Sequence, residues 1–181
     1  MRIRAEETAA LVIDFQERLV PVIDNANGYL HNSETLLKGL KTLGIPMIIT
    51  QQYTKGIGMT VPSIAAAIGE EFSYYDKLSF SCVDDINIDQ KLVELGKKNI
   101  IVCGIEAHVC VLQTVIDLIE KGYHVILVEN CISSRKENDC KAAVQRAITE
   151  GATIATFESI LFELTRKAGT DVFKAISKLI K

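Results

Sequence analysis

The stretch Asn99–Gln113, NIIVCGIEAHVCVLQ, joins a buried strand to the start of a helix. Its first part is an apolar run over 100–103, long enough for a central strand, and Gly104 ends that run. The apolar residues of 109–119 then recur at the spacing of one helix face. This order predicts that Cys110 lies in the first turns of a helix that follows a central strand.

A cysteine at a helix start has a particular chemistry. Unpaired backbone N–H groups and the positive end of the helix favour a thiolate over a thiol, so Cys110 is a candidate nucleophile at neutral pH. The alternative is a small apolar side chain packed beneath a turn, which is the commoner situation for a single cysteine.

Strand and helix patterns alternate along the whole chain. Strands are predicted over 8–14, 45–50, 72–80, 100–103, 125–128 and 153–156. Helices are predicted from Asn32 or Ser33 to 43, and over 62–68, 89–95, 109–121, 134–150, 159–167 and 171–180. In the helix over 134–150, the residues expected to face the core are Ala142, Ala143, Ala147 and Ile148. This alternation predicts a three-layer αβα fold of the α/β class: a doubly wound, mostly parallel six-stranded sheet, Rossmann-like, in a single domain over 1–181.

Composition argues against several kinds of partner. Lys and Arg number 20 against 23 Asp and Glu, which gives a net charge of −3. The basic residues are scattered along the chain and do not form a patch of the kind that binds nucleic acid. The first strand begins within about eight residues of Met1, which leaves no room for a signal peptide, and no apolar run is long enough to span a bilayer. Five cysteines without a CxxC pair do not resemble a secreted disulfide framework. We expect a cytoplasmic protein whose partner is a small-molecule substrate, with neither nucleic acid nor membrane.

Three reactive residues follow predicted strands. Asp14 ends the first strand, Lys77 belongs to a short edge strand, and Cys110 follows the fourth. If the first and fourth strands are neighbours, Asp14 and Cys110 face one crevice at the carboxyl edge of the sheet. The acid could then take the thiol proton, while the lysine stabilises the resulting charges. Taken alone, Asp14 could equally be a helix cap or a loop acid.

Five segments together resemble the isochorismatase-like cysteine hydrolases, and most of all a subgroup of isochorismatase-domain proteins of undefined substrate. They are ALVIDFQ, TQQYTKGIGMTVPSI, DKLSFSCV, CGIEAHVCVLQTV and ATIATFESILFEL, spread over nearly the whole chain. The resemblance implies that Asp14 is the general base, Lys77 the catalytic lysine and Cys110 the nucleophile. It also implies that the family is commonly dimeric or larger, so we expect a homo-oligomer. The apolar closing helices over 159–167 and 171–180 agree with that expectation.

The resemblance further implies a non-proline cis peptide at Ile105–Glu106. Such a bond would turn the N–H of Glu106 toward the same point as the N–H of Cys110, and the two would form an oxyanion hole. Nicotinamidase-type members hold a metal through an Asp-x-His motif where this chain reads 51–53, Gln-Gln-Tyr. No metal or cofactor is therefore expected.

Two positions depart from the subgroup. Gln51 stands where the subgroup often has an acid, and Thr54 where it often has proline. We interpret both as rim positions that bear on substrate identity.

Four residues are candidates for the pocket wall: Gln16, Tyr53, Phe80 and His108. Ordinary rim packing is the alternative for the first three, and a backbone-bonded histidine at the helix start is the alternative for His108. The remaining cysteines are interpreted as core or surface thiols.

The leading hypothesis is a metal-independent cysteine hydrolase that cleaves a small amide or a related C–N bond through a thioester intermediate. The alternatives are a catalytically minor, oligomeric interaction protein on a hydrolase scaffold, and isochorismatase or nuclease activity. Isochorismatase activity is the weaker choice, because the resemblance implies that members cleaving that vinyl ether lack the cysteine.

Overall fold

A parallel sheet of six strands forms the centre of the molecule in the computed structural model, which describes residues 2–181 except for the side chains of 26 and 27. The strands are β1 (Thr8–Ile13), β2 (Met47–Gln52), β3 (Tyr75–Lys77), β4 (Asn99–Ile105), β5 (His124–Ser133) and β6 (Thr153–Ala155). Their order is β3-β2-β1-β4-β5-β6, and every neighbouring pair is parallel. The predicted fold class is confirmed, and β1 and β4 are neighbours.

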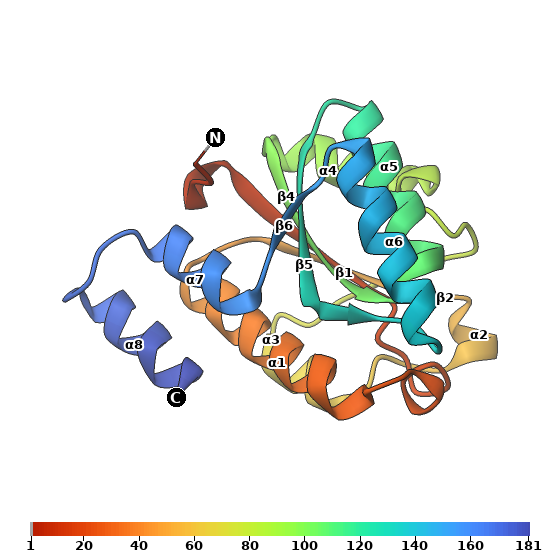
Figure 1. Cartoon of the computed structure of the whole chain (residues 1–181), viewed down its shortest axis with the longest axis horizontal. Helices are drawn as coiled ribbons and strands as arrows, with labels where there is room; N and C mark the ends of the chain where they lie inside the picture. The colour runs from red at the N-terminus through yellow and green to blue at the C-terminus, as the bar shows by residue number, and fades with distance from the viewer. Residues whose placement is uncertain (1) are drawn as a thin grey trace.

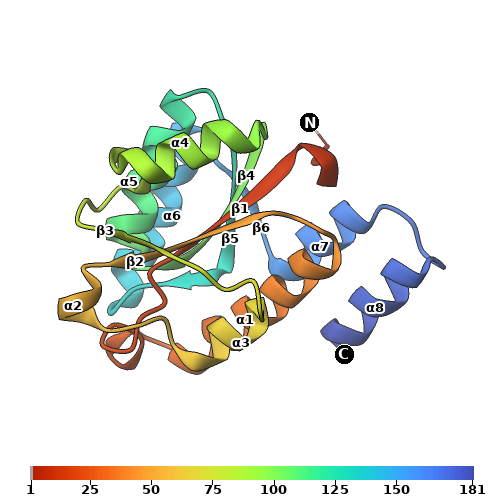
Figure 2. The ribbon, with the colours of Figure 1, turned by 180° about the vertical axis from the view of Figure 1, so that it is seen from behind.

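Helices cover both faces of this sheet (Figures 1 and 2). One face carries α1 (Ala26–Thr42), α3 (Pro62–Ile68), α7 (Phe157–Thr165) and α8 (Asp171–Ile180), and the other carries α4 (Ile86–Leu95), α5 (Leu112–Glu120) and α6 (Glu137–Glu150). A short helix, α2 (Thr54–Ile57), follows β2. Each face of the sheet has its own apolar core, because β1 and β4 are buried along their entire length and alternate their side chains between the two layers.

The strand order reverses between β1 and β4, since the chain winds outward to β2 and β3 on one side and to β5 and β6 on the other. In such sheets the crevice beyond the carboxyl ends of the strands at the switch point is the usual place for a ligand. Asp14 directly follows β1, and Cys110 lies five residues beyond the end of β4.

Three helices begin earlier than the sequence predicts, and α7 does so by two residues, at Phe157. α1 starts at Ala26, and the predicted cap Ser33 lies inside the helix with its hydroxyl donating to the carbonyl of Tyr29 at 2.7 Å. α4 starts at Ile86 because Asp85 caps it, accepting hydrogen bonds from the N–H groups of 87 and 88.

Three other expectations are also corrected. Gly104 does not end β4, which continues to Ile105. β5 runs on to Ser133, so α6 starts only at Glu137. On α6, Ala143 and Ala147 face the core as predicted, but Ala142 and Ile148 are exposed, because the helix buries a narrower face than its composition suggests.

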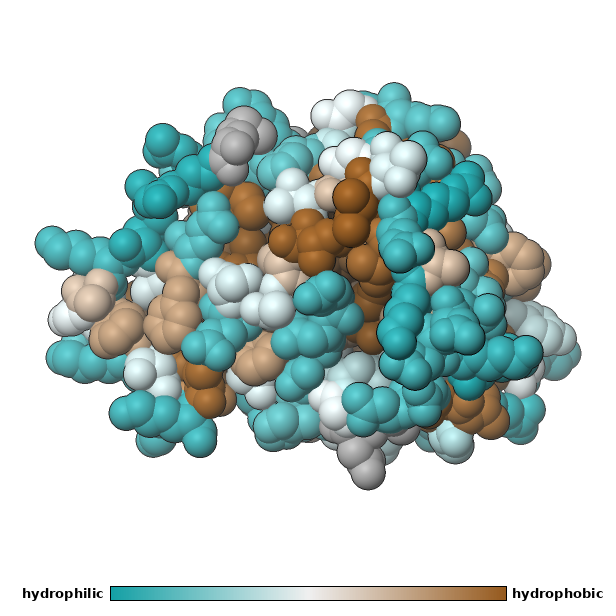
Figure 3. Space-filling model, viewed as in Figure 1, coloured by the Kyte–Doolittle hydropathy of each residue, from teal (hydrophilic) through white to brown (hydrophobic). Residues whose placement is uncertain are grey.

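The face of the molecule that is seen in Figure 1 has an apolar area at its middle (Figure 3). This area lies over the β6 edge between α6 and α7 and is surrounded by hydrophilic residues. Ile154 of β6 is half-buried, and Ile148 of α6 is 52% exposed. Among the described residues, no helix combines the length and the apolarity needed to cross a membrane.

Gly104 allows the close approach of β1 and β4 beside the crevice. Its φ is +133°, and a Cβ there would overlap the backbone oxygen of Ile13. We expect Gly104→Ala to lower the free energy of unfolding by about 3 kcal/mol or more, combining backbone strain with overpacking. Urea unfolding measures this, with Gly96→Ala as control, since Gly96 has a φ of +59° but open space around it. Equal losses in the two variants would contradict the steric argument.

Candidate active site

Asp14 lies at the carboxyl edge of the sheet, directly beyond the last residue of β1. Its φ is +53°, and it is fully buried. The Thr50 hydroxyl donates to one carboxylate oxygen at 2.7 Å, and the Lys77 ammonium donates to the other at 2.8 Å. Both oxygens of the buried carboxylate therefore have a donor, as a charge inside a protein requires.

Lys77 is the last residue of β3, and its side chain runs inward until only 1% of the residue is exposed. Besides Asp14, the ammonium donates to Gln52 Oε1 at 2.7 Å and to the carbonyls of Ser79 and Phe80 at 3.1 and 3.2 Å. Burial by itself lowers the pKa of Lys77, but the charge and hydrogen bond of Asp14, together with the nearby sulfurs of Cys82 and Cys110, outweigh it and the pKa is raised. Lys77 is therefore a fixed cation.

Cys110 lies in a π-helical turn, Ala107–Val111, between β4 and α5. It is 6% exposed. Burial and then the charge of Asp14 raise its pKa well above the ordinary thiol range, although Lys77 acts in the opposite direction. This shift is opposite in direction to the one expected from the helix start, because burial and the charge of Asp14 both favour the protonated thiol.

A cavity of about 300 Å³ opens above this thiol. It is lined by Leu19, Gln52, Ile57, Phe80, Glu106, Val109, Cys110 and Arg135. The nucleophile candidate therefore meets a small, largely apolar space in which a substrate could reach its sulfur.

Comparison with known proteins identifies the family of this chain. A family profile described as the isochorismatase domain matches residues 8–159. The secreted isochorismatase effector Isc1 of Phytophthora sojae is 34% identical over 183 residues, covering 99% of this chain and 87% of the relative. The chain belongs to the isochorismatase family.

Two solved structures share the fold. The MAR1 ribonuclease of Caenorhabditis elegans has a TM-score of 0.93 at 35% identity, covering 99% of this chain and 92% of its own. The YcaC product of Escherichia coli, described as an octameric hydrolase of unknown specificity, has a TM-score of 0.93 at 23% identity, covering 99% and 89%. The α/β architecture is thus that of the isochorismatase family, which supports a hydrolase function.

Of the four predicted wall residues, Phe80 lines the cavity and is 54% exposed. Gln16 is fully buried, and its amide nitrogen donates to the carbonyls of Gln52 and Gly58. Tyr53 is 49% exposed and lies against Gly56. His108 Nδ1 lies 2.9 Å from the hydroxyl of Ser134. Its partner is therefore a side chain, whereas the alternative interpretation expected a backbone group. Gln16, Tyr53 and His108 are not among the residues that line the cavity in the described part of the chain.

Glu106 lines the cavity and binds Arg135 through its side chain, whereas the sequence suggested a role only for its N–H. Its carboxylate binds Arg135 through Nη2 at 2.7 Å, Nε at 3.1 Å and the backbone N–H at 3.1 Å. Burial alone would raise the pKa of Glu106, but the hydrogen bonds and charge of Arg135 lower it. The bond between Ile105 and Glu106 is cis, at the position that the resemblance indicates.

Sequence reasoning missed three residues of the site: Thr50, Gln52 and Arg135. Thr50 and Gln52 end β2 beside Asp14 and Lys77, and Arg135 follows β5. Thr50 and Gln52 had only their position as a sequence signal, since both are polar residues at or just beyond the carboxyl end of the strand predicted over 45–50, whereas Arg135 fell within the helix predicted over 134–150.

The two departures from the subgroup, Gln51 and Thr54, contact each other. The Thr54 hydroxyl lies 2.8 Å from Gln51 Oε1 and 2.7 Å from Asp76 Oδ1, so its single hydrogen is shared between these two acceptors, while Gln51 Nε2 donates to the Thr60 hydroxyl at 2.8 Å. Gln51 is fully buried, so its interpretation as a rim residue is wrong. Over the described residues, no group of three or more His, Cys, Asp or Glu side chains is placed to hold a metal ion.

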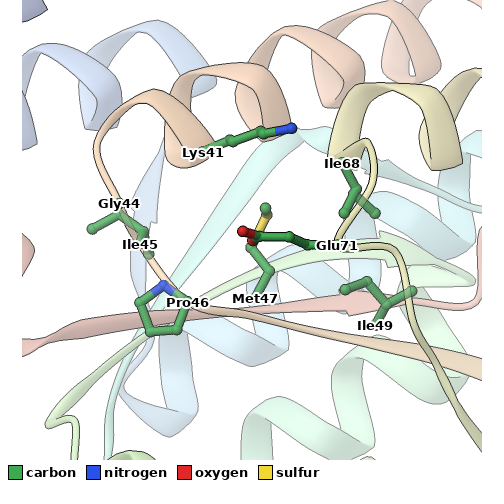
Figure 4. Close-up of a pocket in the computed structure, with 8 residues that line it drawn as sticks. All are labelled: Lys41, Gly44, Ile45, Pro46, Met47, Ile49, Ile68 and Glu71. Atoms are coloured by element: carbon green, nitrogen blue, oxygen red, sulfur yellow. The ribbon is translucent and has the colours of Figure 1, made fainter.

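A larger cavity, of about 430 Å³, lies at the opposite edge of the sheet. It is formed where α1 leads into β2, with Lys41 and Glu71 beside the apolar side chains of Met47, Ile49 and Ile68 (Figure 4). None of Asp14, Lys77 and Cys110 borders it, so cavity size does not identify the site here.

We predict that the ion pair between Asp14 and Lys77 dominates local stability. Lys77→Met leaves a buried carboxylate unpaired, and we expect a loss of about 3–5 kcal/mol in the free energy of unfolding. The double variant with Asp14→Asn should cost less than the sum of the single variants, because the uncompensated charge is gone. Urea unfolding of the four proteins measures this coupling.

A surface pair provides the control for this cycle. Lys141 and Glu137 are 2.7 Å apart, with side chains 65% and 68% exposed. Lys141→Met should leave stability nearly unchanged. Additive effects of the Asp14 and Lys77 substitutions would contradict the energetic role given to the buried pair.

Proposed function

We propose that the chain is a cysteine hydrolase that cleaves a small amide, or a related C–N bond, through a thioester and without a metal ion. The observation that carries the proposal is the Cys110 thiol beneath a cavity, next to the buried pair of Asp14 and Lys77. A protonated thiol needs a base within reach, and Asp14 is that base.

In the first half of the reaction, the Asp14 carboxylate takes the thiol proton and the Cys110 sulfur attacks the carbonyl carbon. The tetrahedral intermediate collapses as the C–N bond breaks, and Asp14 returns the proton to the leaving amine. In the second half, Asp14 takes a proton from water, whose oxygen attacks the thioester carbon. The C–S bond breaks, the sulfur regains a proton and a carboxylic acid leaves.

The developing oxyanion needs donors of its own. We assign this role to the N–H groups of Glu106 and Cys110, which lie at the junction of β4 and the π-helical turn. Donors of this kind are typically worth about 10²–10³ in rate each.

The cavity wall supports a small, uncharged acyl group. Four of its side chains are apolar: Leu19, Ile57, Phe80 and Val109. Its charged lining residues, Glu106 and Arg135, neutralise each other. A volume of about 300 Å³ suits a substrate of few heavy atoms.

Ribonuclease activity is the second candidate, because the C. elegans structure at 35% identity carries that name. A net charge of −3 and a largely apolar cavity favour the small amide over RNA. An interaction protein on a hydrolase scaffold remains the non-enzymatic alternative. The cytoplasmic location also stays a prediction, and the P. sojae relative is named as secreted.

Mass spectrometry of the intact protein tests the thioester. We expect an acyl adduct when the wild type is incubated with small amides, ureides and activated esters, and none with Cys110→Ala. Asp14→Asn should slow adduct formation by about 10²-fold or more, because the base is lost. Cys140→Ala is the matched control, since Cys140 is a partly exposed thiol outside the cavity.

Two outcomes would count against this proposal. An adduct that persists in Cys110→Ala would exclude the nucleophile, and no adduct with any compound would favour the interaction protein. A parallel incubation with labelled RNA distinguishes the ribonuclease, for which cleavage without any adduct is expected.

We also propose a homo-oligomer, dimeric or larger. The support is the apolar area over the β6 edge and the octamer described for E. coli YcaC. We expect light scattering to give a mass of at least twice 20.0 kDa, and Ile148→Glu combined with Ile154→Glu to reduce it. A monomer at micromolar concentration would refute this.

A further inference from the structure

Gln52 makes the shortest contact with the Lys77 ammonium. The distance from Nζ to Gln52 Oε1 is 2.7 Å, against 2.8 Å to Asp14 and 3.1–3.2 Å to the carbonyls of Ser79 and Phe80. An ammonium has three hydrogens, so the two short contacts take one each and the two carbonyls share the third. Gln52 and Asp14 together therefore set the direction of this cation.

The orientation of the Gln52 amide is fixed from its other end. Its Nε2 donates to the carbonyl of Leu78 at 2.8 Å. A flipped amide would place an NH₂ group against the ammonium and an oxygen against a carbonyl, which leaves both contacts repulsive. Gln52 thus ties β2 to the residues that follow β3.

The backbone of Gln52 is held by a second glutamine. Gln16 Nε2 donates to the Gln52 carbonyl at 3.0 Å, and the Gln52 N–H donates to Gln16 Oε1 at 2.7 Å. Just beyond the end of β1, the Gln16 side chain therefore makes the two hydrogen bonds with the Gln52 backbone that a neighbouring strand would otherwise make. Both glutamines are more than nine-tenths buried, so neither has water as an alternative partner.

We propose that Gln52 is the positioning residue for Lys77. Its neutral oxygen directs the ammonium toward Asp14 and the Cys110 thiol without adding a second negative charge. This inference rests on the proposed function. In that function, the proton transfer from Cys110 to Asp14 moves the negative charge from the carboxylate to the sulfur, and Lys77 lies near both groups. An acid in place of Gln52 would attract Lys77 away from Asp14 and oppose a charge on the sulfur.

The test is the pH dependence of Cys110 alkylation by iodoacetamide, followed by peptide mass spectrometry. We expect Gln52→Glu to slow alkylation by about tenfold across the accessible pH range, which corresponds to an upward shift of the profile by about one pH unit, since a like charge disfavours the thiolate. Gln52→Met keeps the volume but removes both hydrogen bonds. It should slow alkylation at neutral pH by about tenfold, the factor for one pKa unit.

The neighbouring residue Gln51 supplies matched controls. It is as buried as Gln52 and equally hydrogen-bonded, but its partners are Thr60 and Thr54, and it points to the other face of β2. Gln51→Met should leave the profile in place, and Gln51→Glu should shift it far less than Gln52→Glu. Equal shifts at the two positions would overturn the positioning role while leaving Cys110 as the nucleophile.

A double-mutant cycle gives a readout that does not depend on cysteine chemistry. If Gln52 acts through Lys77, Gln52→Met should destabilise the wild type to urea more than it destabilises Lys77→Met. Equal shifts of the urea midpoint in the two backgrounds would contradict the inference. If Cys110 of the wild type does not react, the proposed function is refuted but the positioning role of Gln52 is not. The double-mutant cycle then tests that role independently.

Discussion

The buried ion pair between Asp14 and Lys77 constrains the rest of the structure. Removing two charges from water costs several kcal/mol per ion, and only good geometry with further hydrogen bonds offsets it. The ends of three strands supply that geometry: Asp14 follows β1, Thr50 and Gln52 end β2, and Lys77 ends β3. A slip of one residue in either strand pairing would point these side chains to the wrong face, so the site and the sheet register depend on each other.

Much of the fold was predictable because its central strands, β1 and β4, are buried on both faces. Long apolar runs such as 8–13 and 99–105 have few other interpretations in a chain of this size. The errors fall where tertiary contacts outweigh local pattern. Ser33 is a residue type typical of a helix cap, yet it lies buried inside α1, where its hydroxyl binds the Tyr29 carbonyl one turn back and lies 3.4 Å from the Cys131 carbonyl of β5.

The site divides in the same way. Asp14, Lys77 and Cys110 carry reactive groups that stand out in a sequence, and the order of the motifs links them. Their supporting residues do not stand out: Gln52 lies 25 positions from Lys77, and Arg135 lies 29 positions from Glu106. Nothing in the sequence distinguishes the two glutamines at the end of β2. Gln52 binds the Lys77 ammonium, whereas Gln51 binds the loop that contains Thr60.

The thiol shows why a local electrostatic argument can give the wrong sign. A helix end contributes about 0.3–1 kcal/mol, whereas full burial can shift a pKa by about 3–5 units, or several kcal/mol. The balance at Cys110 therefore favours a thiol at rest. In the proposed mechanism this is no obstacle, because the proton passes to Asp14 while Lys77 keeps its charge. The three groups together are neutral before and after the transfer, so no new net charge has to be created inside the protein, and the negative charge only changes its place beside a fixed cation.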